Sequence, residues 1–154
     1  MAPPQRILLI VGGGIAAYKT LELIRLLKKA GREVRVVLTK AAQAFVTPLS
    51  AAALSGGKVY TDLFDLTDET EMGHIVLSRQ ADLVVVAPAT ADLMAKLAGG
   101  QANDLASTLL LATDKRVLMA PAMNVRMWRH PATQRNLAAL GADGVLVTVP
   151  DEGE

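Results

Sequence analysis

Cysteine is absent from this 154-residue chain, and aromatic residues make up only 3% of it. The lack of cysteine excludes disulfides, thiolate metal sites and a cysteine nucleophile within these residues. Neither sign of charge dominates, because sixteen Lys and Arg residues are balanced by fifteen Asp and Glu residues. The chain also has no basic block and no basic stripe interleaved with aromatics, so nucleic acid is not an expected partner.

Long apolar runs are missing as well. Every purely apolar run is far shorter than the ~18 residues that a membrane-spanning helix requires. The N-terminal residues Met-Ala-Pro-Pro-Gln-Arg lead directly into strand-like sequence and do not resemble a signal peptide. We therefore expect a cytoplasmic protein with no membrane partner. Hydrophobic residues still make up 51% of the chain, which is typical of small-residue helices packed on a Val-rich parallel sheet.

Short aliphatic runs alternate with helical patterns along the whole chain. The expected strands are 7–11, 33–38, 58–60, 82–87, 117–120 and 145–149, and the expected helices are 15–30, 41–45, 48–54, 91–98, 102–112 and 131–140. Pro88 is expected to end the fourth strand and Gly141 the last helix. The carboxylate-rich segment 61–71 is expected to be a surface loop. This alternation predicts one α/β domain with a three-layer, doubly wound parallel sheet of Rossmann-like or flavodoxin-like type.

A glycine-rich turn, Gly12-Gly-Gly-Ile-Ala-Ala17, follows the first strand and matches the G-x-G-x-x-G/A pattern. Free backbone amides at the start of a helix favour a nucleotide phosphate, although three glycines could merely let the helix pack closely on the strand. The second strand ends at Thr39 and Lys40, where an NAD site usually carries an acid. This favours FMN over NAD, while Lys40 leaves NADP open.

A second turn of small residues, Ala87-Pro88-Ala89-Thr90, follows the most clearly buried strand. Small side chains would let backbone amides approach a ring or a phosphate. Thr90 could cap the following helix, donate to a ligand or do both. Two turns suited to anions, at two strand ends, strengthen the nucleotide hypothesis.

The segment Pro121-Ala-Met-Asn-Val-Arg-Met-Trp128 begins where the strand 117–120 stops. Open α/β sheets bind their ligands at this carboxyl edge. Asn124 is an uncharged amide between Met123 and Met127, beside the only Trp. Such a group could hold a carboxylate in dry surroundings, as a decarboxylase requires.

Only two histidines occur. His130 precedes Pro131 at the start of an expected helix, and we interpret it as a cap or a surface residue. His74 is a candidate for proton transfer or carboxylate binding, with a purely structural role as the alternative. No metal site is predicted, because the His residues are separated and no carboxylates have ligand spacing. No Ser lies in a G-x-S-x-G context, so an organic cofactor is the favoured source of chemistry.

Together, four segments resemble the homo-oligomeric flavin-containing cysteine decarboxylases. They are the segments 13–19, 72–79 and 87–96, and the segment 121–128 with His130 and Pro131. The P-x-M-N-x-x-M-W pattern beside a G-H-I histidine is highly specific, whereas the glycine turn is not. The resemblance implies a single FMN-binding decarboxylase domain over residues 1–154. It also implies conversion of 4'-phosphopantothenoylcysteine to 4'-phosphopantetheine in coenzyme A biosynthesis, through flavin oxidation of the thiol to a thioaldehyde.

The same resemblance implies roles for individual residues. Asn124 would bind the carboxylate of the substrate, supported by Met127 and Met123, and His74 would be the catalytic base. The FMN site would be formed by Gly13, Gly14, Thr39, Ala87, Pro88, Ala89 and Thr90. The chain would assemble as a homotrimer or a trimer-based dodecamer with FMN where subunits meet. Four cations remain open as ligands for the phosphate of the substrate: Arg79, Lys96, Arg126 and Arg129.

Three alternative functions stay open from the sequence. A flavin decarboxylase acting on C-terminal cysteines of peptides would share the fold and the chemistry. A nicotinamide-dependent dehydrogenase is favoured by the glycine turn and opposed by Thr39 in place of an acid. A non-catalytic flavoprotein could instead serve as a regulatory subunit.

The family resemblance yields a prediction about products. Family members carry a mobile flap whose cysteine donates a proton in the final reduction, and bacterial members often continue into a ligase half. This chain ends at Glu154 without any cysteine and is expected to lack both. We predict that it binds FMN, oxidises and decarboxylates the substrate, but completes the reduction poorly. Mass spectrometry of the products should find the unsaturated enethiol; saturated 4'-phosphopantetheine as the main product at normal turnover would contradict this.

Overall fold

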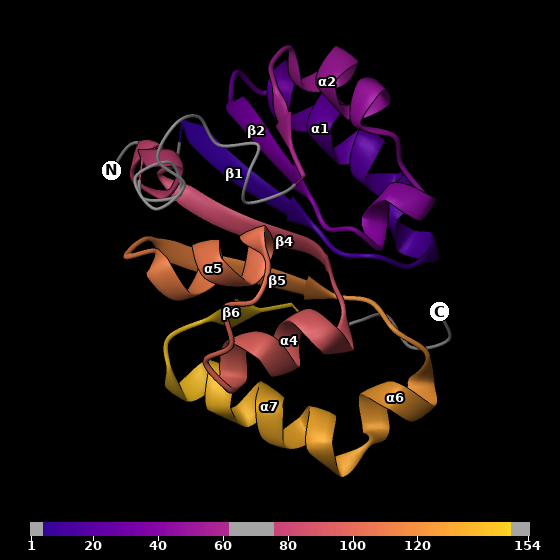
Figure 1. Cartoon of the computed structure of the whole chain (residues 1–154), viewed down its shortest axis with the longest axis vertical. Helices are drawn as coiled ribbons and strands as arrows, with labels where there is room; N and C mark the ends of the chain where they lie inside the picture. Colours follow the sequence, from indigo (N-terminus) through magenta and orange to yellow (C-terminus); the bar gives the residue numbers. More distant parts are fainter. Residues whose placement is uncertain (1–4, 62–75, 149–154) are drawn as a thin grey trace.

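The computed structural model describes residues 5–61 and 76–148. Six parallel strands form one sheet in the order β3-β2-β1-β4-β5-β6 (Figure 1). Their bounds are β1 Arg6–Val11, β2 Glu33–Leu38, β3 Val59–Tyr60, β4 Leu83–Ala89, β5 Arg116–Pro121 and β6 Leu146–Val147. The chain winds outward from β1 to β3 and then returns to β4 on the other side of β1. The strand order therefore reverses between β1 and β4, as in Rossmann-type sheets.

Helices cover both faces of this sheet (Figure 1). One face packs against η1 (Ile15–Tyr18), α1 (Lys19–Lys29), η2 (Ala42–Ala44) and α2 (Pro48–Ser55). The other face packs against a helical segment at 76–80 and against α4 (Ala91–Ala98), α5 (Leu105–Ala112) and α7 (Pro131–Ala142). A five-residue helix, α6 (Val125–Arg129), follows β5 at the carboxyl edge. The predicted three-layer, doubly wound α/β fold is confirmed.

Burial on both faces explains why the central strands are continuous apolar runs. In β1, Leu8 and Ile10 join one core cluster, whereas Leu9 and Val11 join the other. All four side chains are buried almost completely. Alternating side chains point to opposite faces of a strand, so a strand covered on both faces needs apolar residues at every position. Each such side chain contributes about 1.5–3 kcal/mol of burial free energy.

Two predicted element ends were wrong. Strand β4 does not stop before Pro88 but continues through it to Ala89, with a register shift between Val86 and Ala89. A proline is tolerated at such an irregularity because no regular ladder bond needs its missing N–H. Gly141 lies inside α7, and the positive φ of 92° belongs to Gly144, beyond the end of the helix.

Other predicted bounds shifted for local reasons. Helix α5 begins at Leu105 instead of Ala102, because Asp104 and Ser107 form a capping box. The first turn of the predicted helix 15–30 is the 3₁₀ turn η1. Most of the carboxylate-rich segment, residues 62–71, and residue 149 of the last predicted strand lie outside the described residues. Within the described ranges, no helix is long and apolar enough to cross a membrane.

Gly12 joins the ends of β1 and β4 by a close backbone contact. Its N–H donates to the carbonyl of Pro88 at 3.0 Å. A Cβ atom on Gly12 would lie 2.6 Å from that carbonyl oxygen and 2.9 Å from Cγ2 of Thr90. Only glycine therefore allows the two strand ends to approach this closely.

We predict that Gly12→Ala lowers the free energy of unfolding by about 1–3 kcal/mol, because the added methyl group collides with a backbone oxygen that has little freedom to move. Gly57→Ala is the matched control, since a Cβ atom there meets no atom within 4 Å. The control should change stability by less than about 1 kcal/mol. Urea unfolding followed by circular dichroism measures both. Equal stability of the two variants would show that the ends of β1 and β4 can move apart without lowering the free energy of unfolding.

Candidate functional site

A cleft of about 780 Å³ opens at the carboxyl edge of the sheet, where β1, β4 and β5 end. The glycine turn and the start of α1 line one side of it, and the segment 121–125 lines the other. This is the point where the strand order reverses, which is where doubly wound sheets bind their ligands. The volume lies within the usual range of small-molecule sites.

The structure brings several of the predicted site residues together in this cleft. Gly13, Gly14, Pro88, Met123 and Asn124 all line it. The remaining β4 residues, Ala87, Ala89 and Thr90, belong to or directly follow the strand that ends beside it, and Thr39 follows the neighbouring strand β2. Met127 lies on α6 with 45% of its surface exposed and does not line the cleft. His74 lies outside the described residues.

The glycine turn serves both packing and ligand access. A Cβ atom on Gly13 would overlap Ala41, so packing against neighbours accounts for this glycine as it does for Gly12. Gly14 differs, because a Cβ atom there would meet nothing within 4 Å and its φ is 128°. The N–H groups of Gly13 and Gly14 donate to no group in the described part of the chain. Free N–H groups beside a cleft are suited to an anion.

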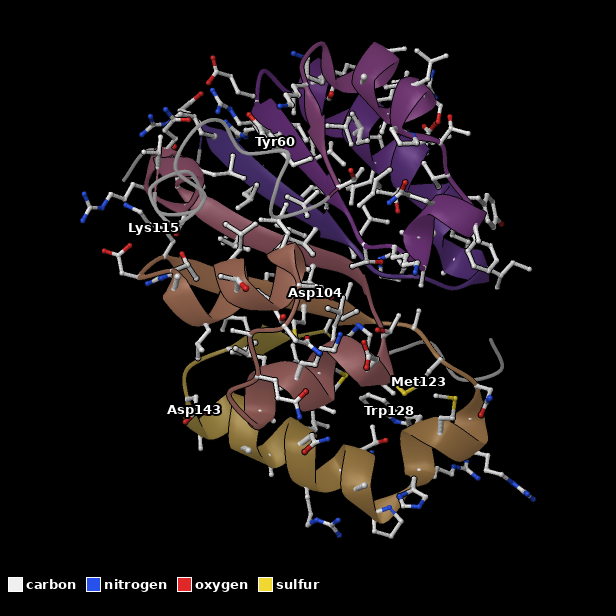
Figure 2. The ribbon with its side chains drawn as sticks, in the orientation of Figure 1. Tyr60, Asp104, Lys115, Met123, Trp128 and Asp143 are labelled. Atoms are coloured by element: carbon white, nitrogen blue, oxygen red, sulfur yellow. The ribbon has the colours of Figure 1, made fainter. Side chains whose placement is uncertain are left out.

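Asn124 caps α6 and is held in one orientation by that cap. Its Oδ1 accepts a hydrogen bond from the backbone N–H of Met127 at 2.9 Å. A backbone N–H can only donate, so the oxygen must face the helix and the NH₂ group is left to donate. Met123 and Trp128 pack together against the large core cluster and support this corner (Figure 2). Helix α6 was not predicted from the sequence. The signal that could have identified it is Asn124, a residue type that often caps a helix, directly before Val125.

Thr90 and His130 also cap helices, and Thr39 accepts a hydrogen bond in the turn that precedes η2. Oγ1 of Thr39 accepts from the N–H of Ala42, and Oγ1 of Thr90 accepts from the N–H of Leu93, both at 3.1 Å. Each hydroxyl uses an acceptor lone pair for this hydrogen bond and keeps its own proton for a ligand. Nδ1 of His130 accepts from the N–H of Ala132 at 3.0 Å, so the interpretation of His130 as a cap is confirmed.

Lys96, one of the four candidate phosphate ligands, is engaged elsewhere. Its Nζ lies 3.2 Å from carboxylate oxygens of both Asp92 and Asp104, and its side chain is only 17% exposed. Burial alone would lower the pKa of Lys96, but hydrogen bonds to the two carboxylates outweigh burial and raise this pKa. Burial alone would raise the pKa of Asp104, but hydrogen bonds from Ser107 and Lys96 hold it below its usual value. Lys96 thus ties α4 to the start of α5.

The three candidate arginines lie in two other places. Arg79 belongs to the helical segment that precedes β4, and its neighbours Leu77 and Gln80 line a separate cavity with Arg6 at the start of β1. That is the opposite edge of the sheet from the cleft. Arg126 and Arg129 border an open hollow of about 530 Å³ beside α6 and do not line the cleft.

Lys19 lines the cleft, and sequence reasoning did not single it out. It is the first residue of α1 and lies at the end of the segment 13–19. Its position one turn after the glycines was the signal that could have identified it. Within the described residues, no group of three or more His, Cys, Asp or Glu side chains could hold a metal ion.

The reversal of strand order and the glycine turn define a doubly wound α/β protein, and its cleft lies at the edge where such sheets bind their ligands. The chain belongs to the Flavoprotein family, whose model matches residues 1–154.

Similar proteins agree with this membership. The coenzyme A biosynthesis bifunctional protein CoaBC of Escherichia coli K12 is 54% identical over 149 residues, which are 97% of this chain and 37% of that protein. This chain therefore spans well under half the length of that relative. The crystal structure of the FMN-dependent cysteine decarboxylase SpaF has a TM-score of 0.90 at 36% identity, covering 96% of this chain and 85% of that one. A PPC decarboxylase mutant complexed with pantothenoylaminoethenethiol has a TM-score of 0.83 at 32% identity, covering 97% and 84%.

The Lys96 contacts yield a pH-dependent prediction for Asp104→Asn, which keeps an N-cap oxygen but removes the charge facing Lys96. Because the pKa of Asp104 is lowered in the folded protein, its charge stabilises the fold above the unfolded pKa of about 3.9. That stabilisation is lost as the pH falls through the folded pKa. The variant should be less stable than the unchanged protein at pH 7, and the difference should close under acid conditions.

Asp114→Asn is the matched control for this experiment. Asp114 is exposed and forms no ion pair within the described ranges. Thermal unfolding of the variants between pH 7 and pH 3 measures the effect. A difference for Asp104→Asn that does not change with pH would contradict the role assigned to its charge.

Proposed function

We propose that this chain is an FMN-binding domain, spanning residues 1–154, that decarboxylates 4'-phosphopantothenoylcysteine in coenzyme A biosynthesis. The observation that carries the proposal is Asn124, whose amide NH₂ is presented as a donor in the same cleft as the glycine turn. A carboxylate that must leave as CO₂ needs donors that hold it without a permanent charge pair. CoaBC relatives and the PPC decarboxylase structure support the choice of substrate.

The described residues fit FMN. The free N–H groups of Gly13 and Gly14 suit its phosphate, and the cleft has room for a nucleotide-sized ligand. The end of β2 carries Thr39 instead of the acid that NAD-type ribose binding uses. Gly13, Gly14, Thr39, Ala87, Pro88, Ala89 and Thr90 would hold the cofactor. Bound there, FMN would supply the two-electron oxidation that converts the CH₂–SH group of the substrate to a thioaldehyde.

The residues of the chain would direct the remaining chemistry. A carboxylate β to the new C=S bond can depart as CO₂ and leave its electron pair in an enethiolate. Asn124 would orient that carboxylate, with Met123 keeping water away from it. Met127 would support the site through its backbone N–H, which holds Oδ1 of Asn124. His74 would act as the base that removes the proton accompanying thiol oxidation. Its assignment rests on the family resemblance of the segment 72–79.

We also propose that the protein assembles as a homotrimer or as a dodecamer built from trimers. Ile15 is 78% exposed at the rim of the cleft, and Leu49 on α2 is 81% exposed. Ile15 is thus a large apolar side chain exposed at the ligand site, and Leu49 is another exposed on the surface; both support contact with another subunit. Such contact would exclude water from the cleft and complete the cover over the cofactor.

The test uses native mass spectrometry and CO₂ release on the purified protein. The expected result is one FMN per subunit in a trimer-based assembly, with CO₂ released from 4'-phosphopantothenoylcysteine. A peptide ending in cysteine is the competing substrate. Release of CO₂ from the peptide alone would favour a peptidyl-cysteine decarboxylase. A bound nicotinamide nucleotide instead of FMN would overturn the proposal.

Variants of Asn124 separate its chemical role from its role as a cap. Asn124→Ser retains an N-cap oxygen and loses the NH₂ donors, whereas Asn124→Ala loses both. We expect both to retain FMN and to lower the rate of CO₂ release by about 10²-fold or more. Only the Ala variant should also lower the unfolding temperature. An unchanged rate for Asn124→Ser would show that the amide does not hold the carboxylate.

A further inference from the structure

We propose that Lys19 binds the phosphate of the substrate and so sets the preference for phosphorylated over unphosphorylated cysteine conjugates. This inference rests on the proposed function and names the phosphate ligand that the sequence left open. Lys19 begins α1 and lines the same cleft as Asn124. The two residues come from opposite sides of it, one following β1 and the other following β5.

The charge of Lys19 is not balanced within the cleft. No Asp or Glu lines the cleft among the described residues, and Lys19 forms no ion pair within the described ranges. Other cations of the fold are engaged: Arg6 pairs with Asp82, Arg25 with Glu22, and Lys96 with two carboxylates. An exposed ammonium group with no counter-charge beside it is a favourable site for a phosphate dianion.

The four cations considered from the sequence fit less well. Lys96 is held by Asp92 and Asp104, and Arg79 lies at the opposite edge of the sheet. Arg126 and Arg129 border the separate hollow beside α6. Lys19 is the cation that shares a cleft with Asn124 in the described part of the chain. A substrate with a carboxylate at one end and a phosphate at the other would therefore lie across the cleft between Asn124 and Lys19.

FMN also carries a phosphate monoester, so the experiment must separate two sources of the same chemistry. The free amides of Gly13 and Gly14 already suit the cofactor phosphate, which leaves the ammonium group of Lys19 for the substrate. The two sources differ in what is lost on mutation. Loss of a contact to the cofactor releases FMN, whereas loss of a contact to the substrate phosphate weakens only the binding of the phosphorylated substrate.

The experiment compares Lys19→Met and Lys19→Arg with Lys29→Met, in which an exposed lysine at the other end of α1 loses the same charge. Each protein is analysed for FMN per subunit. Calorimetric titration and the KM for CO₂ release are then measured with the phosphorylated and the unphosphorylated conjugate. The titration reports binding even where turnover is slow.

We expect Lys19→Met to weaken binding of the phosphorylated conjugate about 10- to 100-fold, as the loss of one charge-assisted contact implies. The unphosphorylated conjugate should change by less than about twofold, FMN content and kcat should be retained, and Lys19→Arg should recover most of the loss because it keeps the charge. Lys29→Met should match the unchanged protein.

Two results would overturn the inference. Loss of FMN from Lys19→Met would assign Lys19 to the cofactor phosphate. Equally weakened binding of both conjugates would show that Lys19 makes no contact with the substrate phosphate. Failure of the proposed function looks different, because the unchanged protein would then release CO₂ from neither conjugate. The titration would still decide whether Lys19 distinguishes them.

Discussion

The contact between the N–H of Gly12 and the carbonyl of Pro88 is the constraint on which the site depends. It holds the ends of β1 and β4 together where the strand order reverses. A second backbone bond, from the N–H of Ala122 to the carbonyl of Ala89 at 3.1 Å, extends this alignment to β5. These two bonds bring the glycine turn and the segment 121–125 to the same cleft. Each side of the site is thus positioned by the backbone, and side chains are left free for the ligand.

Helix caps give the site its chemical character. Asn124, Thr39 and Thr90 each use an oxygen lone pair to accept a backbone N–H at the start of a helix. These hydrogen bonds use acceptor lone pairs, so the NH₂ group of Asn124 in the cleft and the hydroxyl protons of the two threonines beside it are left to donate. Together with the ammonium group of Lys19, they favour ligands with several anionic groups. A flavin phosphate and a substrate carboxylate meet this requirement.

Local sequence predicted what local interactions determine. The strands were evident from apolar runs, and the caps at Thr90 and His130 from residue type and position. The prediction that β4 stops before Pro88 was wrong, because the place of Pro88 in β4 depends on a register shift against β5, which is a tertiary feature. The pairing of Lys96 with Asp92, four residues earlier on α4, is a local feature that the sequence offered, whereas its pairing with Asp104 depends on how the chain returns between α4 and α5. Gly13, Gly14, Pro88, Met123 and Asn124 line one cleft, and their roles in it stay predictions. Lys19 was not singled out because its significance depends on which cations are already paired.

The pairing of β1 with β4 has a consequence for how the protein is made. Arg6 and Asp82, which join the starts of these strands, are 76 positions apart in the chain. Such long-range pairing carries a large loop-closure entropy and forms late, after the local unit of β1, α1 and β2. The cleft therefore exists only in the completed fold, and a ligand that binds there selects that state by mass action. The lifetime of newly synthesised chains in the cell should accordingly depend on the supply of cofactor.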